Sequence, residues 1–170
     1  TWTILSSLSN IVKMFTPLTN RIYYLDIDGA YYYNGTLFQL PNNQKVVGFA
    51  CATSTAVVLT DLGNVYTSST NAFSTLVTAT WGTDRIVKVS VGYYSSDIYY
   101  VYLSQSGRVF GSGSSTWGQL NSGTTVANPT LIPIVSTTNV AQVYDVYATN
   151  LGNIIALSYP PQIYNEFDGY

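Results

Sequence analysis

The chain has 170 residues and a net charge of −2, and its residues are 46% hydrophobic but only 8% charged. This length suffices for one ordinary domain with a hydrophobic core, and the apolar content is too high for a disordered chain. The low charge, without any basic run, excludes electrostatic binding to nucleic acid or anionic membrane, and no apolar run approaches the ~20 residues that span a bilayer.

The predicted elements recur along the chain as a short strand followed by a tight hairpin. The short strands are rich in residues that favour β structure: Ile11–Phe15 (I-V-K-M-F), Val46–Ala50 (V-V-G-F-A), Ile86–Ser90 (I-V-K-V-S) and Val140–Tyr144 (V-A-Q-V-Y). Each hairpin is eight residues long, with an aliphatic start and an aromatic end: Leu25–Tyr32, Leu59–Tyr66, Leu103–Phe110 and Leu157–Tyr164. The pattern predicts a repeat of β units.

A turn residue stands at the fifth position of every hairpin. It is Gly29, Gly63 and Gly107 in the first three, and Pro161 in the fourth. Glycine accepts a positive φ without strain, so these positions are predicted structural turns.

The repeat predicts one all-β domain over residues 1–170. Its units are approximately 10–45, 46–85, 86–139 and 140–170, with 1–9 as a blade tail. Hairpin starts lie 34 to 54 residues apart, which brackets the ~40–50 residues of a propeller blade. No window shows sustained helical periodicity. The expected fold is therefore four blade-like antiparallel units of β-propeller type.

One segment carries a family resemblance. Val109–Leu120 reads V-F-G-S-G-S-S-T-W-G-Q-L, and Val65–Leu76 fits the same twelve-residue frame. These segments resemble the repeat of the regulator of chromosome condensation family, whose consensus runs V-Y-x-W-G-x-N-x-x-G-Q-L-G-x-G. The resemblance implies a β-propeller. That family has seven blades and a characteristic histidine, whereas this chain supplies about four repeats and has no histidine. It therefore implies a partial or oligomer-completed propeller, and the family's nucleotide-exchange activity is not carried over.

The two ends of the chain complement each other. The opening T-W-T-I-L-S-S resembles T-W-G-Q-L-N-S at Thr116–Ser122, which is the tail of a repeat, and the last unit has no such tail. Pairing two such parts removes an exposed strand edge. We expect residues 1–9 to complete a blade in the same chain or in another copy.

No catalytic, cofactor or metal site is expected. The absence of histidine excludes a histidine-based triad, and no spacing nominates a carboxylate pair. Asp26-Ile27-Asp28-Gly29 resembles the start of a calcium loop, but Ala30 occupies the third ligand position. Cys51 is the only cysteine, so it forms no internal disulfide and is interpreted as a small buried strand residue.

Two kinds of surface feature stand out. Asn34-Gly35-Thr36 is a sequon for N-glycosylation. Tyrosine-rich strands suggest an interaction surface for a protein or a sugar, with these candidates: Tyr31, Tyr33, Tyr93, Tyr94 and Tyr99.

The sequence therefore predicts a non-catalytic structural or interaction module, not an enzyme. The Tyr-, Ser- and Thr-rich composition favours an extracellular or cell-surface location, and the complementary ends favour further copies of the chain as partner. The alternative is a secreted binding propeller, either a protein inhibitor or a carbohydrate-binding lectin. Size-exclusion mass separates the two.

Overall fold

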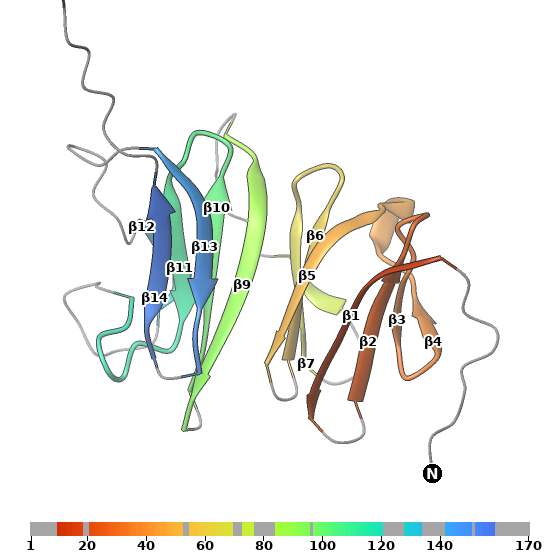
Figure 1. Cartoon of the computed structure of the whole chain (residues 1–170), viewed down its shortest axis with the longest axis horizontal. Coiled ribbons are helices and arrows are strands. Elements are labelled where there is room, and N and C mark those ends of the chain that lie inside the picture. Colours follow the sequence, from red (N-terminus) through yellow and green to blue (C-terminus); the bar gives the residue numbers. More distant parts are fainter. Residues whose placement is uncertain are drawn as a thin grey trace, which may run out of the picture.

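The computed structural model describes residues 10–18, 21–52, 55–69, 73–76, 84–95, 97–120, 128–133, 142–150 and 152–158. This part is nearly all β and forms four antiparallel sheets, which confirms the expected fold class (Figure 1). The predicted blade tail at residues 1–9 and the predicted turn at Pro161 lie outside the described residues.

The first sheet contains β1 (Ile11–Leu18), β2 (Arg21–Asp26), β3 (Tyr31–Tyr33) and β4 (Thr36–Phe38) in that order. A two-residue turn joins β3 to β4. Its residues Asn34 and Gly35 have φ of 47° and 86°, as in the Asn-Gly turns that match the twist of a hairpin. A 3₁₀ turn at Pro41–Asn43 leads to the next sheet.

The second and third sheets repeat this order. The second contains β5 (Val46–Ala52), β6 (Thr55–Thr60), β7 (Val65–Ser69) and β8 (Phe73–Leu76). The third contains β9 (Ile86–Tyr94), β10 (Asp97–Ser104), β11 (Val109–Gly113) and β12 (Asn128–Pro133). In both sheets, strands that are neighbours in sequence are neighbours in space.

The fourth sheet has two described strands, β13 (Val143–Ala148) and β14 (Ile154–Ser158). The predicted strand at Val140–Tyr144 is therefore misplaced, and the strand begins three residues later. Burial explains the difference, because Val143 and Val146 are the residues that enter the core.

An irregularity in the first strand pair shows that the four units are structural repeats. In every sheet the register shifts between the first and third residues of the first strand. The intervening residue is solvent-exposed in each case: Val12, Val47, Val87 and Tyr144. A β-bulge bends its strand and increases the local twist, so each unit bends at the same place.

Three hydrophobic clusters join the four sheets face to face. The first lies between the β1–β4 and β5–β8 sheets, the second between β5–β8 and β9–β12, and the third between β9–β12 and β13–β14. The first strands also meet, because β1 contacts β5, β5 contacts β9 and β9 contacts β13. The sheets form an open arc rather than a closed ring (Figure 1).

The repeated glycines lie where consecutive units touch. Gly29, Gly63 and Gly107 have φ of +81°, +79° and +82°, the left-handed region that tight turns require. A Cβ added at any of the three would lie within 3.2 Å of the residue just before the next unit's first strand, which is Lys45, Arg85 and Gln142 respectively.

Candidate interaction surfaces

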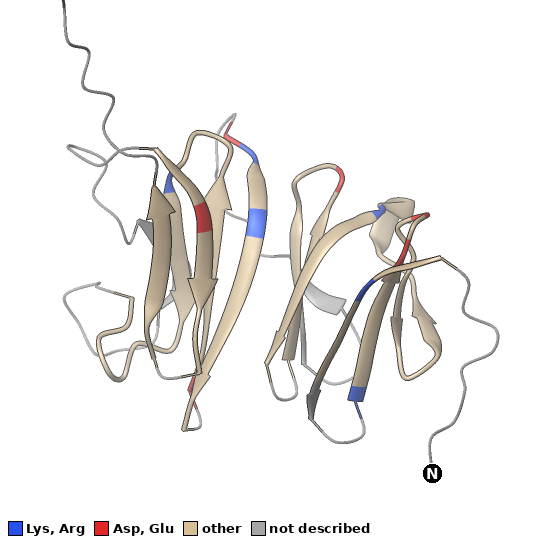
Figure 2. Cartoon of the chain, viewed as in Figure 1, with Lys and Arg blue, Asp and Glu red and all other residues tan. Residues whose placement is uncertain are grey.

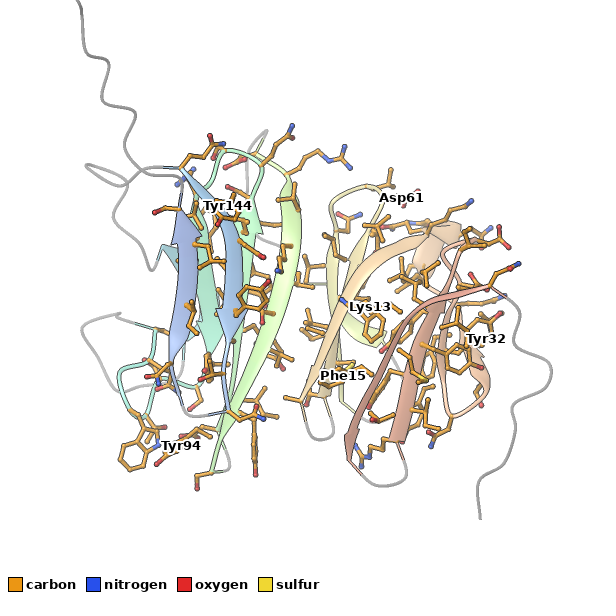
Figure 3. The ribbon with its side chains drawn as sticks, in the orientation of Figure 1. Lys13, Phe15, Tyr32, Asp61, Tyr94 and Tyr144 are labelled. Carbon is orange, nitrogen blue, oxygen red and sulfur yellow. The ribbon has the colours of Figure 1, made fainter. Side chains whose placement is uncertain are left out.

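Among the described residues, no second sheet packs on the outer face of the β1–β4 sheet. Met14, Tyr24, Tyr32 and Leu37 pair in one row across its four strands. Met14 is 60% exposed and Leu37 47%, while Tyr24 is buried and stacks on Tyr32 with ring centroids 4.6 Å apart. Figure 3 shows Tyr32 on this outer side of the arc. We call this row the back face.

The later units bury their own back faces. Strand register places Phe49, Val89 and Val146 at the position of Met14. These three side chains are 1%, 6% and 0% exposed, each packed against the preceding sheet. Met14 is therefore exposed because no described sheet packs against it, although its strand is built like the first strands of the later units.

The opposite end of the arc shows the reverse situation. Ile155 and Leu157 of β14 are 48% and 37% exposed. Their counterparts in the first three units face the following sheet. The counterparts of Ile155 are Tyr23, Val57 and Val101, which are 5%, 0% and 0% exposed. The counterparts of Leu157 are Leu25, Leu59 and Leu103, which are 4%, 3% and 3% exposed. We call Ile155 and Leu157 the front face.

A groove of about 790 Å³ runs along the first strands of the four units. Its wall is mostly apolar, with two lysines, and contains these residues: Lys13, Phe15, Thr16, Phe49, Ala50, Cys51, Ala52, Lys88, Val89, Ser90, Val91, Tyr93, Tyr147, Ala148, Thr149 and Asn150. Lys13 and Phe15 point from β1 toward β5 (Figure 3). Sites of this size and polarity are typical of ligand pockets.

The two lysines of the groove have different surroundings. Lys88 forms an ion pair with Asp145, and its Nζ lies 4.0 Å from the centre of the Tyr147 ring. Lys13 donates a hydrogen bond of 2.8 Å to the carbonyl oxygen of Phe49 and lies 5.0 Å from that ring. Burial lowers the pKa of Lys13, and the charge of Lys88 adds to this effect.

The ion pair makes stability pH-dependent. Burial of Asp145 opposes its ionisation, but hydrogen bonds from Lys88 and Tyr147 outweigh burial and lower its pKa. A carboxylate whose pKa is lowered in the folded state stabilises the fold at pH values above its ordinary pKa, near 3.9. This stabilisation is lost as the pH falls through the pKa of the folded state.

We therefore predict that Asp145→Asn destabilises the protein by about 1 kcal/mol at pH 7, an amount limited by solvent screening, and by less near pH 3. Urea unfolding at pH 3, 5 and 7 measures this. Asp97→Asn is the matched control, because Asp97 makes no ion pair or side-chain hydrogen bond among the described residues. A loss that is the same at all three pH values would contradict the assignment.

Two of the tyrosines predicted to form an interaction surface are buried. Tyr31 is 1% exposed and Tyr99 is 0% exposed, so neither can form an interaction surface. Both rings lie between sheets, in the first and third clusters. Tyr33 and Tyr93 are partly buried against the first and second clusters, and Tyr94 is 37% exposed.

An exposed tryptophan accompanies Tyr94. Trp117 is 65% exposed, and its ring meets that of Tyr94 edge to face, with centroids 5.6 Å apart. Figure 3 shows Tyr94 at one end of the arc's third sheet. In the sequence, Trp117 stands out only as part of a repeat motif. Its place in a Ser- and Gly-rich loop could have predicted that its side chain is exposed.

The remaining candidate residues take structural roles. Asn34 is exposed in the β3–β4 turn, and its Oδ1 accepts a hydrogen bond of 2.8 Å from the backbone of Ile22. Asp26 uses its carboxylate on the turn itself, accepting 3.0 and 2.8 Å bonds from the backbone N–H groups of Asp28 and Ala30. Cys51 is buried, and burial raises the pKa of its thiol to about 12.

Charged side chains are sparse, and most lie at turns and strand ends (Figure 2). Nowhere in the described ranges do three His, Cys, Asp or Glu side chains come together as they would to hold a metal ion. Across the same residues, no helix has the length and apolar character needed to cross a bilayer.

Comparison with solved structures identifies the fold. Human WBSCR16 aligns with a TM-score of 0.69 and 13% identity, over 88% of this chain and 45% of that one. Prp20p from Saccharomyces cerevisiae, studied for its binding to Gsp1p and histones, aligns with a TM-score of 0.62 and 14% identity, over 84% of this chain and 42% of that one. The chain has an RCC1-like β-propeller repeat fold.

A third structure, yeast RCC1 (Prp20) bound to Kap60, gives a TM-score of 0.59 and 14% identity, over 88% of this chain and 42% of that one. The chain thus spans less than half the length of these propellers. No family model and no curated protein sequence matches it.

Proposed function

We propose that this chain is a non-catalytic interaction module that associates through its front and back faces, with further copies of itself as the partner. The observation that carries the proposal is the contrast at Met14 and Ile155. Each is about half exposed or more, while every counterpart in a unit that has a neighbour is nearly fully buried.

The front face of one copy is expected to fit the back face of another. Within the chain, the front of each unit packs on the back of the next at three successive interfaces. A front face on one copy and a back face on another repeat this arrangement. Burying the exposed part of Met14, Leu37, Ile155 and Leu157 would contribute about 1 kcal/mol each.

Head-to-tail contacts form either closed rings or open filaments, depending on whether the rotation closes. Two copies make the smallest ring in which every front face meets a back face.

Placement outside the cell is part of the proposal. It is supported by the low charge and by the Tyr-, Ser- and Thr-rich composition. The exposed sequon at Asn34 then becomes available for glycosylation in a eukaryotic secretory pathway. The alternative is a secreted propeller that acts as a protein inhibitor or as a carbohydrate-binding lectin. The exposed pair of Trp117 and Tyr94 favours this alternative.

Light scattering on the purified chain tests self-association. We expect a mass of at least twice the 18.6 kDa of one chain at micromolar concentrations. Met14→Glu and Ile155→Glu should each reduce it to the monomer mass, because each buries a charge in the contact. Val47→Glu is the matched control, since Val47 is 57% exposed but lies at a bulge, away from both end faces.

Three results would count against the proposal. The chain could stay monomeric at all concentrations, which favours the alternative binding propeller. The Val47→Glu variant could dissociate as readily as the end-face variants. Finally, a mixture of the Met14→Glu and Ile155→Glu variants could stay monomeric, although the unsubstituted front face of the first and the unsubstituted back face of the second should pair into a dimer.

A further inference from the structure

The groove between the first strands has no role in the proposed association. It lies on the inner side of the arc, along β1, β5, β9 and β13, whereas the front and back faces lie at the two ends. Its wall combines aromatic side chains, among them Phe15, Phe49 and Tyr93, with the ammonium groups of two lysines. An inference about the groove therefore stands apart from self-association.

The two lysines occupy equivalent places in the repeat. Lys13 and Lys88 are both the third residue of a first strand, and strand register pairs them with Leu25 and Leu103 respectively. The same position in the intervening strand β5 is Gly48, which brings no side chain between them. The two charges are close enough that Lys88 contributes to lowering the pKa of Lys13.

The charge in the groove is only partly compensated. Asp145 neutralises Lys88 in the one ion pair found among the described residues. Lys13 has the carbonyl oxygen and the ring of Phe49, but no carboxylate in the described part of the chain. A partly desolvated ammonium group without a counter-ion favours an anionic ligand, because a charge-assisted hydrogen bond replaces the weaker neutral one.

The apolar wall selects the kind of anion. A small hydrated anion gains nothing from Phe15 and Tyr93, whereas a peptide can place apolar side chains against them. Nucleic acid needs an extended positive surface, and two lysines on a chain of net charge −2 do not form one. Charge complementarity and the apolar wall thus agree on one class of ligand.

We propose that the groove binds an acidic peptide segment, with a carboxylate side chain hydrogen-bonded to Lys13 and neighbouring apolar side chains packed on Phe15 and Tyr93. The ion pair of Lys88 and Asp145 holds the far wall of the groove in place. This site is separate from the end faces, so a chain that cannot self-associate binds the same peptide.

The test uses a fluorescein-labelled pentapeptide of alternating leucine and glutamate, and a counterpart in which glutamine replaces glutamate. Fluorescence anisotropy measures binding to the full chain. We expect the glutamate peptide to bind and the glutamine peptide to bind about tenfold more weakly. Lys13→Gln should weaken binding of the glutamate peptide by a similar factor. Lys45→Gln is the matched control, because Lys45 lies outside the groove. Circular dichroism checks that each variant is folded.

Each outcome decides the proposal. Binding by the Met14→Glu variant equal to that of the unchanged chain supports a site independent of assembly. Absence of binding at millimolar peptide, equal binding of the two peptides, or equal loss in the Lys13 and Lys45 variants would overturn the proposal. Displacement of the peptide by 10 mM inorganic phosphate at constant ionic strength would assign the groove to small anions instead.

Discussion

Replacing Gly92 with alanine is expected to lower the free energy of unfolding by about 3 kcal/mol, through overpacking and loss of buried hydrogen bonds. Gly92 in β9 pairs directly with Tyr99 in β10, and the phenol ring lies across the glycine. A Cβ at Gly92 would overlap this ring, so the ring must move.

The ring has no room to move without breaking contacts. The hydroxyl of Tyr99 shares its one proton between the carbonyl oxygens of Thr149 and Asn153, at 2.6 and 3.0 Å, and accepts a 3.2 Å bond from the N–H of Thr149. These bonds tie the third sheet to the turn between β13 and β14. Displacing the ring therefore affects two sheets, not only the pair of strands in which the substitution lies.

Gly48→Ala is the matched control for this prediction. Gly48 also lies in a first strand, but an added Cβ would approach nothing closer than 3.9 Å. Its unfolding free energy should stay within about 0.5 kcal/mol of the unchanged chain. Urea denaturation at one fixed protein concentration measures both variants, because association makes stability depend on concentration. Equal stability of the Gly92 and Gly48 variants would show that the ring does not lie on Gly92.

The first three hairpins were predictable because their pattern is local. An aliphatic residue, a turn and an aromatic residue recur at fixed spacing, and a glycine at the fifth position marks each of these three turns. The first strand of the fourth unit was misplaced because Val140–Tyr144 and Val143–Tyr147 both read as valine, two residues, valine, tyrosine. Only packing distinguishes them, since Val143 and Val146 fill the third cluster.

Surface residues could not be predicted from alternation. In an isolated sheet, alternate residues separate a buried face from an exposed one. In the middle of an arc of stacked sheets both faces are buried, so Tyr99 and Tyr102 of β10 both lie in the core although they face opposite clusters. The exposed faces belong to the end sheets, and which sheets lie at the ends follows only from the three-dimensional arrangement. The lysines of the groove were also missed, because they are far apart in sequence and only the three-dimensional arrangement brings them to one groove.

Gly107→Ala is expected to destabilise the protein by about 2 kcal/mol or more, while Gly118→Ala costs about 1 kcal/mol. Both glycines have a positive φ, +82° and +72°, so both substitutions introduce the same backbone strain. The surroundings differ. Nothing lies within 4 Å of a Cβ at Gly118, whereas a Cβ at Gly107 would lie 2.5 Å from Cγ of Gln142 and 3.1 Å from backbone atoms of Val143.

The difference between the two variants isolates the contact between consecutive units. Gln142 can rotate away, but the N and O atoms of Val143 belong to the start of β13 and move only with the strand. The Gly107 variant should therefore unfold at a lower urea concentration than the Gly118 variant. It should also show faster amide hydrogen exchange in β13 and β14, because the fourth sheet packs less closely against the third. Equal losses of stability, with unchanged exchange in β13, would mean that the glycine serves only its own turn. A larger loss confined to Gly107 would show that the repeated glycine also sets the distance between neighbouring blades, a second reason for its recurrence at the same position in three units.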